Sequence, residues 1–225
     1  MREVPKSKQY AIGWYNEGIA HLGIRDYEEA LSFMDRALGI VPNHPDFLIG
    51  KGDVLYAMER YDEAFENFRN AIREEPENRS AWLKAGLCLL KLNKFVDALE
   101  IFEYLLKGDA YDGELWFARG VALLNLGQKE EALESFRNAR RLKPDQPALW
   151  HALASLEEDH GEAIELLKRG HSIDPTNLDI MLALAGRFLV LGLTEEARLW
   201  CSRAEALYSG NRRLEEVARR CPPAI

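Results

Sequence analysis

The chain has 225 residues, of which 47% are apolar and 29% are charged, and its net charge is −8. This composition predicts a globular protein with a substantial core, and it argues against a general nucleic-acid surface, which is normally basic. Cys88, Cys201 and Cys221 form no CxxC pair or complete disulfide framework, so we expect a reducing, cytoplasmic location. The first ten residues lack the apolar segment of a signal peptide, and the longest apolar stretch is too short for a membrane span.

One amphipathic pattern returns along the chain at a fixed period. Related stretches begin at equal intervals, at Arg60, Lys94 and Gln128, and another opens earlier, at Arg25. An alanine marks every occurrence, with one constant interval except for a shorter step before the fifth: Ala30, Ala64, Ala98, Ala132, Ala163 and Ala197. A fixed period of this length indicates a stacked repeat protein.

Each repeat contains two apolar runs with helical spacing, which predicts two amphipathic helices joined by a turn. A large side chain precedes a small residue by four places: Trp14, Leu48, Trp82, Trp116, Trp150 and Met181, followed by Gly18, Gly52, Gly86, Gly120, Ala154 and Ala185. We expect the small residues where two helix backbones approach closely, with the large side chain filling the space beside them. Four glycines are predicted in the turns: Gly23, Gly127, Gly161 and Gly192.

In chain order we predict a lead-in, six helix pairs and a final helix with its tail: residues 1–10, 11–44, 45–78, 79–112, 113–146, 147–177, 178–211 and 212–225. The fifth pair has lost three residues from its turn at Asp159–Glu162. This loss predicts a tight turn, fraying of the first helix and a local change of superhelical pitch. A surface deletion without structural effect is the alternative.

The sixth pair opens with a helix over residues 178–191 that is apolar on almost every side, so we expect it to be covered on more than one face. The last helix, residues 212–220, carries Leu214 and Val217 on one side and is predicted to cap the preceding second helix. The remaining apolar face of residues 178–191 is expected to meet another molecule.

These residues resemble the tetratricopeptide repeat, whose pattern is W-x2-L-G-x2-Y, then A-x3-F, then P, in a unit of about 34 residues. The match covers about residues 11–211, with six repeats in phase. The resemblance implies an all-α, right-handed α-solenoid of six stacked helix-turn-helix units plus a C-terminal capping helix. It also implies that the first helix of each pair lines a concave groove.

By the same resemblance, partner-binding residues are expected at recurring places on the first helices: Tyr15, Ile19, Ile49, Asp53, Tyr56, Leu83, Leu87, Leu90, Phe117, Val121, Leu124, His151, Leu182 and Leu189. The six of these residues from Leu83 to Leu124 are expected to form a continuous apolar strip. The alternative is that they are half-buried core residues. Residues 26–77 contain thirteen acids against five bases, which favours a partner with basic flanks.

The carboxylate clamp of chaperone-binding family members is not expected here. Its places hold Tyr15, Ile19, Gly50, Ser80 and Lys84, of which only Lys84 keeps the charge type. A partner bound through a terminal carboxylate in that frame is therefore not predicted.

No combination of residues indicates catalysis. The five histidines pair with no other ligand at a metal-binding spacing, His160 is placed in a solvated turn, and no nucleophile, base and oxyanion site comes together. Cys201 is expected to be a buried thiol and Cys221 an exposed, reactive one. We expect no enzyme, cofactor, metal, nucleic-acid or membrane function.

The function predicted from the sequence is a protein-interaction scaffold that binds an apolar or amphipathic partner helix with basic flanks in its groove. One alternative is a self-associating structural array, such as a homodimer. A second is a non-catalytic regulatory subunit of an enzyme assembly. Concentration-dependent mass separates the first two, and a co-purified enzyme would indicate the third.

Overall fold

The computed structural model describes residues 6–221, which contain thirteen α-helices and no strand. The predicted all-α class is confirmed. The chain divides after Ala110 into two compact units. Within each unit the helices pack as consecutive antiparallel pairs, the arrangement of an α-solenoid.

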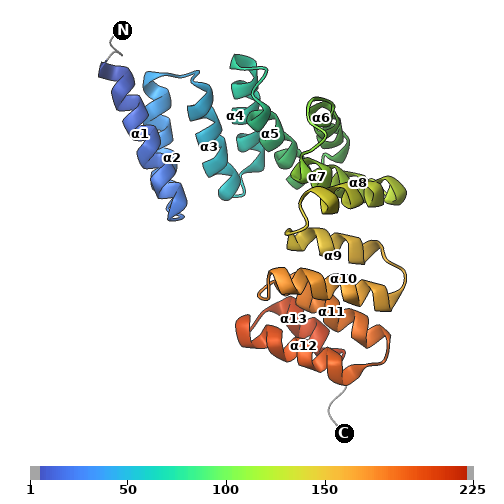
Figure 1. The fold of residues 1–225 in the computed structure, drawn as a ribbon. Coiled ribbons are helices and arrows are strands. Elements are labelled where there is room, and N and C mark those ends of the chain that lie inside the picture. The colour runs from blue at the N-terminus through green and yellow to red at the C-terminus, as the bar shows by residue number, and fades with distance from the viewer. Residues whose placement is uncertain (1–5, 222–225) are drawn as a thin grey trace. The chain divides into compact units, whose positions relative to one another are not determined.

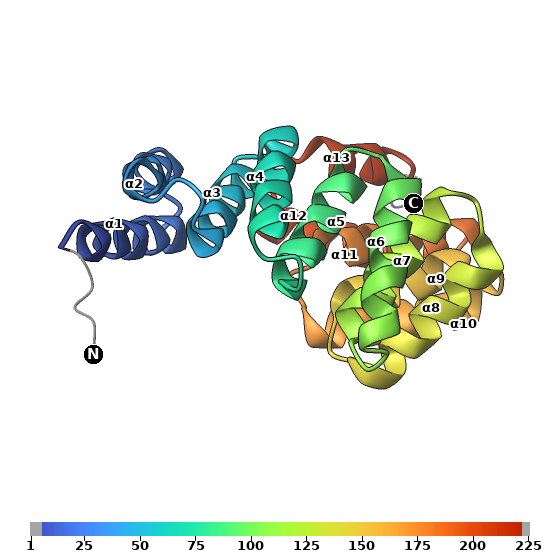
Figure 2. The same ribbon diagram turned by 90° about the horizontal axis from the view of Figure 1, so that it is seen from above.

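Between residues 6 and 110, the first unit contains six helices joined by short turns. They are α1 (Lys6–Gly23), α2 (Tyr27–Ile40), α3 (Pro45–Ala57), α4 (Tyr61–Glu74), α5 (Arg79–Lys91) and α6 (Phe95–Gly108). α1 packs on α2, α3 on α4 and α5 on α6, and both views in Figures 1 and 2 show α3 beside α4. α1 begins within the predicted lead-in, so residues 6–10 are helical, whereas residues 1–5 lie outside the described part.

The described part of the second unit, residues 111–221, contains seven helices. They are α7 (Gly113–Asn125), α8 (Lys129–Leu142), α9 (Pro147–Leu156), α10 (His160–Ile173), α11 (Leu178–Val190), α12 (Thr194–Leu207) and α13 (Arg212–Arg219). Figure 1 shows α9, α10, α11 and α12 lying one after another, with α13 against the last two. Residues 222–225, part of the predicted tail, lie outside the described part.

In the pairs α3–α4, α5–α6 and α7–α8 the two helices approach closely because a glycine on the first helix faces a phenylalanine ring on the second. A Cβ added at Gly52 would lie 2.5 Å from the Phe68 ring, and one added at Gly120 would lie 2.5 Å from the Phe136 ring. Carbon atoms in contact are normally about 3.5–4.0 Å apart, so no side chain fits there without movement. Phe136 is fully buried, and the phenylalanine four places after the repeated alanine therefore fills the space beside the glycine.

The tryptophans have a different role from the one predicted. Trp14, Trp82 and Trp116 are only half-buried, and the space beside the glycine in their repeats is filled by Met34, Phe102 and Phe136 of the second helix, respectively. The Trp82 indole donates a hydrogen bond to the Pro76 carbonyl at 2.8 Å, and the Trp150 indole donates one to the Pro144 carbonyl at the same distance. These bonds join the start of a first helix to the proline that follows the preceding pair.

The turn between the helices of a pair places one residue in the left-handed region. These residues are Arg25, Glu59, Asn93, Gly127 and Gly192, with φ between 58° and 79°. Two of the predicted turn glycines lie elsewhere, since Gly23 ends α1 and Gly161 is the second residue of α10. The pair formed by α9 and α10 has no left-handed residue, because the three-residue deletion removed that part of the turn.

The shortened turn leaves α9 with 10 residues, whereas α7 and α11 have 13 each. The last carbonyls of a helix need partners from outside the helix. Arg187 of α11 supplies them, because its Nη2 donates to the Ala154 carbonyl at 2.7 Å and to the Glu157 carbonyl at 3.3 Å. A side chain of the next pair thus satisfies carbonyls at the end of the shortened helix. The predicted change of superhelical pitch stays a prediction.

The last helix covers the end of the second unit. Leu214 is 1% exposed and belongs to the buried cluster that contains Leu184 of α11 and Trp200 of α12, with Val217 packed against it. The contacts predicted for Leu214 and Val217 are thus present. α11 is largely covered by its own chain, so the predicted contact with another molecule is not needed to bury it.

Candidate protein-binding surface

In the first unit, the predicted partner-binding residues lie on α1, α3 and α5. Ile19 is 39% exposed, and the others are half-buried: Tyr15, Ile49, Asp53, Tyr56, Leu83, Leu87 and Leu90. The Tyr15 ring stacks on Phe47 of α3, with centroids 5.2 Å apart, and Ile49 and Tyr56 contact the buried cluster around Phe68. These side chains therefore contribute to packing and keep part of their surface accessible.

A small hollow of about 110 Å³ opens between α3, α4 and α5. Its apolar lining comes from Tyr56, Phe68 and Leu87, and its polar lining is an ion pair in which Lys84 Nζ lies 2.5 Å from Asp53 Oδ1. Burial raises the pKa of the Asp53 carboxyl more than the Lys84 ammonium lowers it. The hollow is therefore lined mainly by apolar side chains, with the Lys84–Asp53 ion pair at one edge.

In the second unit, the predicted residues lie on α7, α9 and α11. Phe117, Val121, Leu124, His151 and Leu189 are half-buried. Leu182 is only 7% exposed and belongs to the buried cluster of α11 and α12, so it is core, in contrast to its predicted role. The expected strip is divided between the two units: Leu83, Leu87 and Leu90 lie in the first, and Phe117, Val121 and Leu124 lie in the second. Each group is half-buried within its own unit.

Phe117 contributes more to the core than the sequence suggested. Its ring lies 5.8 Å, centroid to centroid, from the buried ring of Phe136. A charged substitution at Phe117 would therefore disturb the helix pair α7–α8 as well as the surface. Leu87, which faces the hollow in the first unit, is the better position for testing partner binding.

Sequence reasoning missed several polar contacts between successive helix pairs. Lys84 of α5 pairs with Asp53 of α3, and Arg213 of α13 places its Nη1 2.7 Å from the carboxylate oxygen of Asp179 on α11. An acid and a base separated by nearly one repeat period occupy neighbouring pairs, so this spacing was a usable signal. His160 was predicted to lie in a solvated turn, but it is the first residue of α10. Arg187 Nη1 donates to its Nδ1 at 2.8 Å.

The described residues 6–221 contain no group of three or more His, Cys, Asp or Glu side chains arranged to hold a metal ion. Over the same residues, no helix combines the length and the apolar character that a membrane crossing requires.

The three thiols differ in their surroundings. Cys88 and Cys201 are buried, and Cys221 is half-buried, not exposed as predicted, with its Sγ 3.8 Å from the Val217 carbonyl. Burial raises the pKa of Cys88 to about 12, and burial together with the neighbouring Cys221 thiol raises the pKa of Cys201 to about 11. Because the thiolate is the reactive form, both buried thiols are largely protonated and unreactive near neutral pH.

Iodoacetamide at pH 8 is therefore expected to alkylate Cys221 at least tenfold faster than Cys88 or Cys201 in the folded chain. The rates of the two buried thiols should rise about tenfold per pH unit, as the thiolate fraction does below the pKa. Mass spectrometry of peptides from timed samples measures all three rates, and alkylation in urea is the control. Equal rates in the folded chain would contradict the burial of Cys88 and Cys201.

Comparison with known proteins places the fold in a family. Two family models described as tetratricopeptide repeat match, one over residues 49–114 and the other over residues 22–64, 89–156 and 154–217. The second model alone covers more than half of the chain, so the chain belongs to the tetratricopeptide repeat family. No curated protein matches it by sequence.

Solved structures agree with this fold. PilW, a type IV pilus biogenesis factor, has a TM-score of 0.81 and 19% identity, covering 93% of this chain and 99% of its own. PilF of Pseudomonas aeruginosa has a TM-score of 0.76 and 19% identity, covering 95% and 98%. YrrB, described as a TPR protein with an unusual peptide-binding site, has a TM-score of 0.59 and 27% identity, covering 77% and 91%.

Proteins of this family generally mediate protein–protein interactions and are not themselves catalytic. The coarse functional prediction from the sequence, a protein-binding module, agrees with the family assignment.

Proposed function

We propose that the chain is a protein-interaction scaffold that binds an apolar or amphipathic partner segment along the inner face of α1, α3 and α5. The observation that carries the proposal is the row of partly accessible apolar side chains on these three helices, from Ile19 through Tyr56 to Leu87. Burying one such side chain fully is worth about 1.5–3 kcal/mol, so a few of them support useful affinity. YrrB, a structural neighbour described with a peptide-binding site, makes a peptide an apt occupant for this face.

The charge of the first unit supports a partner with basic flanks. Residues 26–77 carry thirteen acids and five bases. Asp35 is paired with Lys51 at 2.6 Å and Glu63 with Arg60 at 2.7 Å, but the acidic excess remains after such pairing. Electrostatic attraction of this kind mainly accelerates association and weakens with salt, while apolar contacts set the dissociation rate.

A peptide selection on the full chain tests the proposal. Random peptides long enough to form about four helical turns are displayed on phage and selected on the wild-type chain. One recovered peptide is labelled with fluorescein for anisotropy measurements. We expect recovered sequences with apolar residues at helical spacing and Lys or Arg at the ends. Leu87→Asp is expected to weaken binding of the labelled peptide at least tenfold, because it places a charge in the apolar hollow.

Val96→Asp is the matched control, since Val96 is 56% exposed on α6 and the variant adds the same charge. Ile19→Asp is the second test variant, on a more exposed part of the face. Loss of helicity in Leu87→Asp would show that Leu87 is a core residue. Binding of the labelled peptide to Ile19→Asp would then test the proposal. Unchanged affinity in both folded variants would contradict the proposal, and a doubled mass at working concentration would indicate self-association instead.

A further inference from the structure

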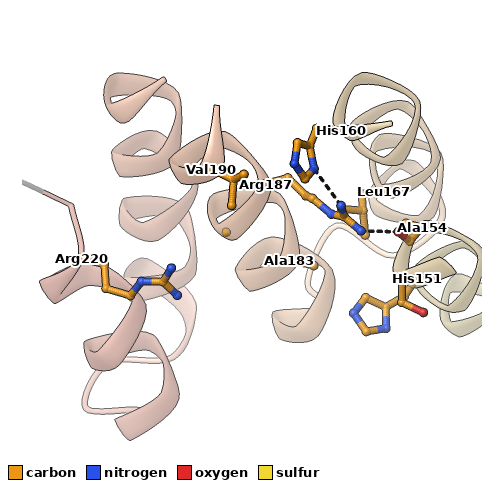
Figure 3. A pocket seen from close by; sticks show the side chains of 10 residues that line it. His151, Ala154, His160, Leu167, Ala183, Arg187, Val190 and Arg220 are labelled. Atoms are coloured by element: carbon orange, nitrogen blue, oxygen red, sulfur yellow. Dashed lines mark hydrogen bonds between the residues drawn. The ribbon is translucent and has the colours of Figure 1, made fainter. Parts of the chain in front are cut away.

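A second hollow, of about 390 Å³, opens in the second unit between α9, α10, α11 and α13. Its apolar lining consists of small and aliphatic side chains such as Ala154, Leu167 and Val190. Its polar lining consists of His151, Ser155, His160, Arg187 and Arg220. Figure 3 shows Arg220 and His151 extending toward this space from opposite sides, with Ala183 of α11 between them.

Among residues 6–221, no carboxylate lines this hollow, although the chain carries 37 acids and a net charge of −8. The nearby acids have other partners. Asp179 is paired with Arg213 at 2.7 Å, and the Glu157 carboxylate accepts the Asp159 backbone N–H at 3.2 Å. The lining of this hollow is therefore basic, whereas the chain as a whole is acidic.

The two arginines of the hollow are used differently. Arg187 is committed to structure, because it donates to the carbonyls of Ala154 and Glu157 and to His160 Nδ1, as the dashed lines in Figure 3 show in part. The carboxyl-end dipole of α9 offsets part of its charge. Arg220 is exposed, and within residues 6–221 its guanidinium has no ion-pair or hydrogen-bond partner.

The histidines of the hollow can donate hydrogen bonds while neutral. Burial lowers the pKa of His151, and the charge of Arg213 adds to this effect while Asp179 opposes it. A guanidinium has no acceptor, so His160 Nδ1 must accept the bond from Arg187, and a neutral His160 ring carries its proton on Nε2. The hollow thus combines one uncommitted cation with neutral imidazole donors.

We propose that this hollow binds the carboxylate of an Asp or Glu side chain presented by a partner protein, with Arg220 as the ion-pairing residue and His151 as a neighbouring donor. The inference goes beyond the proposed function, because this hollow lies in the second unit, whereas the partner segment proposed above binds α1, α3 and α5 of the first unit. A guanidinium and a carboxylate form a paired, bidentate contact. The single uncommitted charge matches a monoanionic carboxylate better than a dianionic phosphate, and the aliphatic lining accommodates the methylenes of the acidic side chain.

Two peptide libraries displayed on phage test this site on the full chain. Both contain random peptides of one common length, one library with Glu and the other with Gln fixed at the centre. We expect the Glu library to give higher recovery on the wild-type chain. The best Glu peptide and its Glu→Gln twin are then synthesised with amidated C-termini, labelled, and titrated against the wild-type chain and the variants.

The wild-type chain is expected to bind the Glu peptide at least tenfold more tightly than its Gln twin. Arg220→Ala should reduce that preference to less than twofold. Arg212→Ala is the matched control, because Arg212 is 92% exposed at the start of α13, the helix that ends just before Arg220, and the variant removes the same charge. Its preference for the Glu peptide should equal that of the wild type. Thermal melts establish that both variants stay folded.

Four outcomes overturn the inference. A Glu preference that survives in Arg220→Ala would show that the carboxylate binds elsewhere. Equal binding of the twin peptides would show that the chain does not recognise an acidic side chain. A phosphoserine version that binds more tightly than the Glu peptide and depends on Arg220 identifies a phosphate site instead. Peptides whose binding is lost in Leu87→Asp but unchanged in Arg220→Ala leave the proposed function standing and remove only this site.

Discussion

Replacing Phe136 with alanine is expected to lower the free energy of unfolding by about 3–5 kcal/mol. The Phe136 ring is fully buried, fills the space beside Gly120 and packs against Phe117. Its removal leaves a cavity between α7 and α8 that the backbone cannot close. Urea unfolding followed by circular dichroism measures the change, and Val96→Ala, at an exposed position, should change it by less than about 0.5 kcal/mol.

The same contact predicts a coupling of definite sign. Gly120→Ala alone should cost about 1–3 kcal/mol, because its Cβ would lie 2.5 Å from the Phe136 ring. Phe136→Leu alone leaves space unfilled and should cost about 1–2 kcal/mol. The double variant should lose less than the sum, since the alanine methyl occupies space that the smaller side chain vacates. Costs that simply add would contradict the close approach of α7 and α8.

Removing the last helix is expected to have the second large effect. Deletion of residues 212–225 would uncover the cluster around Leu184 and Trp200, which Leu214 completes. The point variant Leu214→Asp should cost about 3 kcal/mol or more, because it combines a lost buried leucine with a buried charge. For a chain of this size, that change corresponds to a fall in Tm of roughly 10 °C.

Differential scanning calorimetry and light scattering measure both consequences of losing α13. The truncated chain should melt earlier and aggregate, because a terminal repeat without a polar cover exposes its apolar face. Arg212→Ala should match the wild type, since this side chain is exposed. A truncated chain with the parent's Tm and solubility would show that α13 has no capping role.

The sequence by itself determined the repeat and the helices. The six alanines, the glycines four places after the large residues and the final Leu214–Val217 face predict helix pairs and a last covering helix, because amphipathic spacing is a local property of each helix. The helices α3, α5, α7, α9, α11 and α13 begin at residues 45, 79, 113, 147, 178 and 212, where the predicted segments begin. The glycine positions were also correct as places of close approach.

Only the tertiary structure decided which side chain fills each space and which residue makes each turn. The ring beside Gly120 is Phe136 and not a tryptophan, and the turns use Arg25, Glu59 and Asn93 in the left-handed region, which composition alone would assign to glycine. Arg187 caps the end of α9 from the next helix pair, and Arg220 and His151 line the same hollow. Contacts of this kind depend on the rotation between successive helix pairs and on side-chain reach, and neither is encoded in the spacing of residues along one helix.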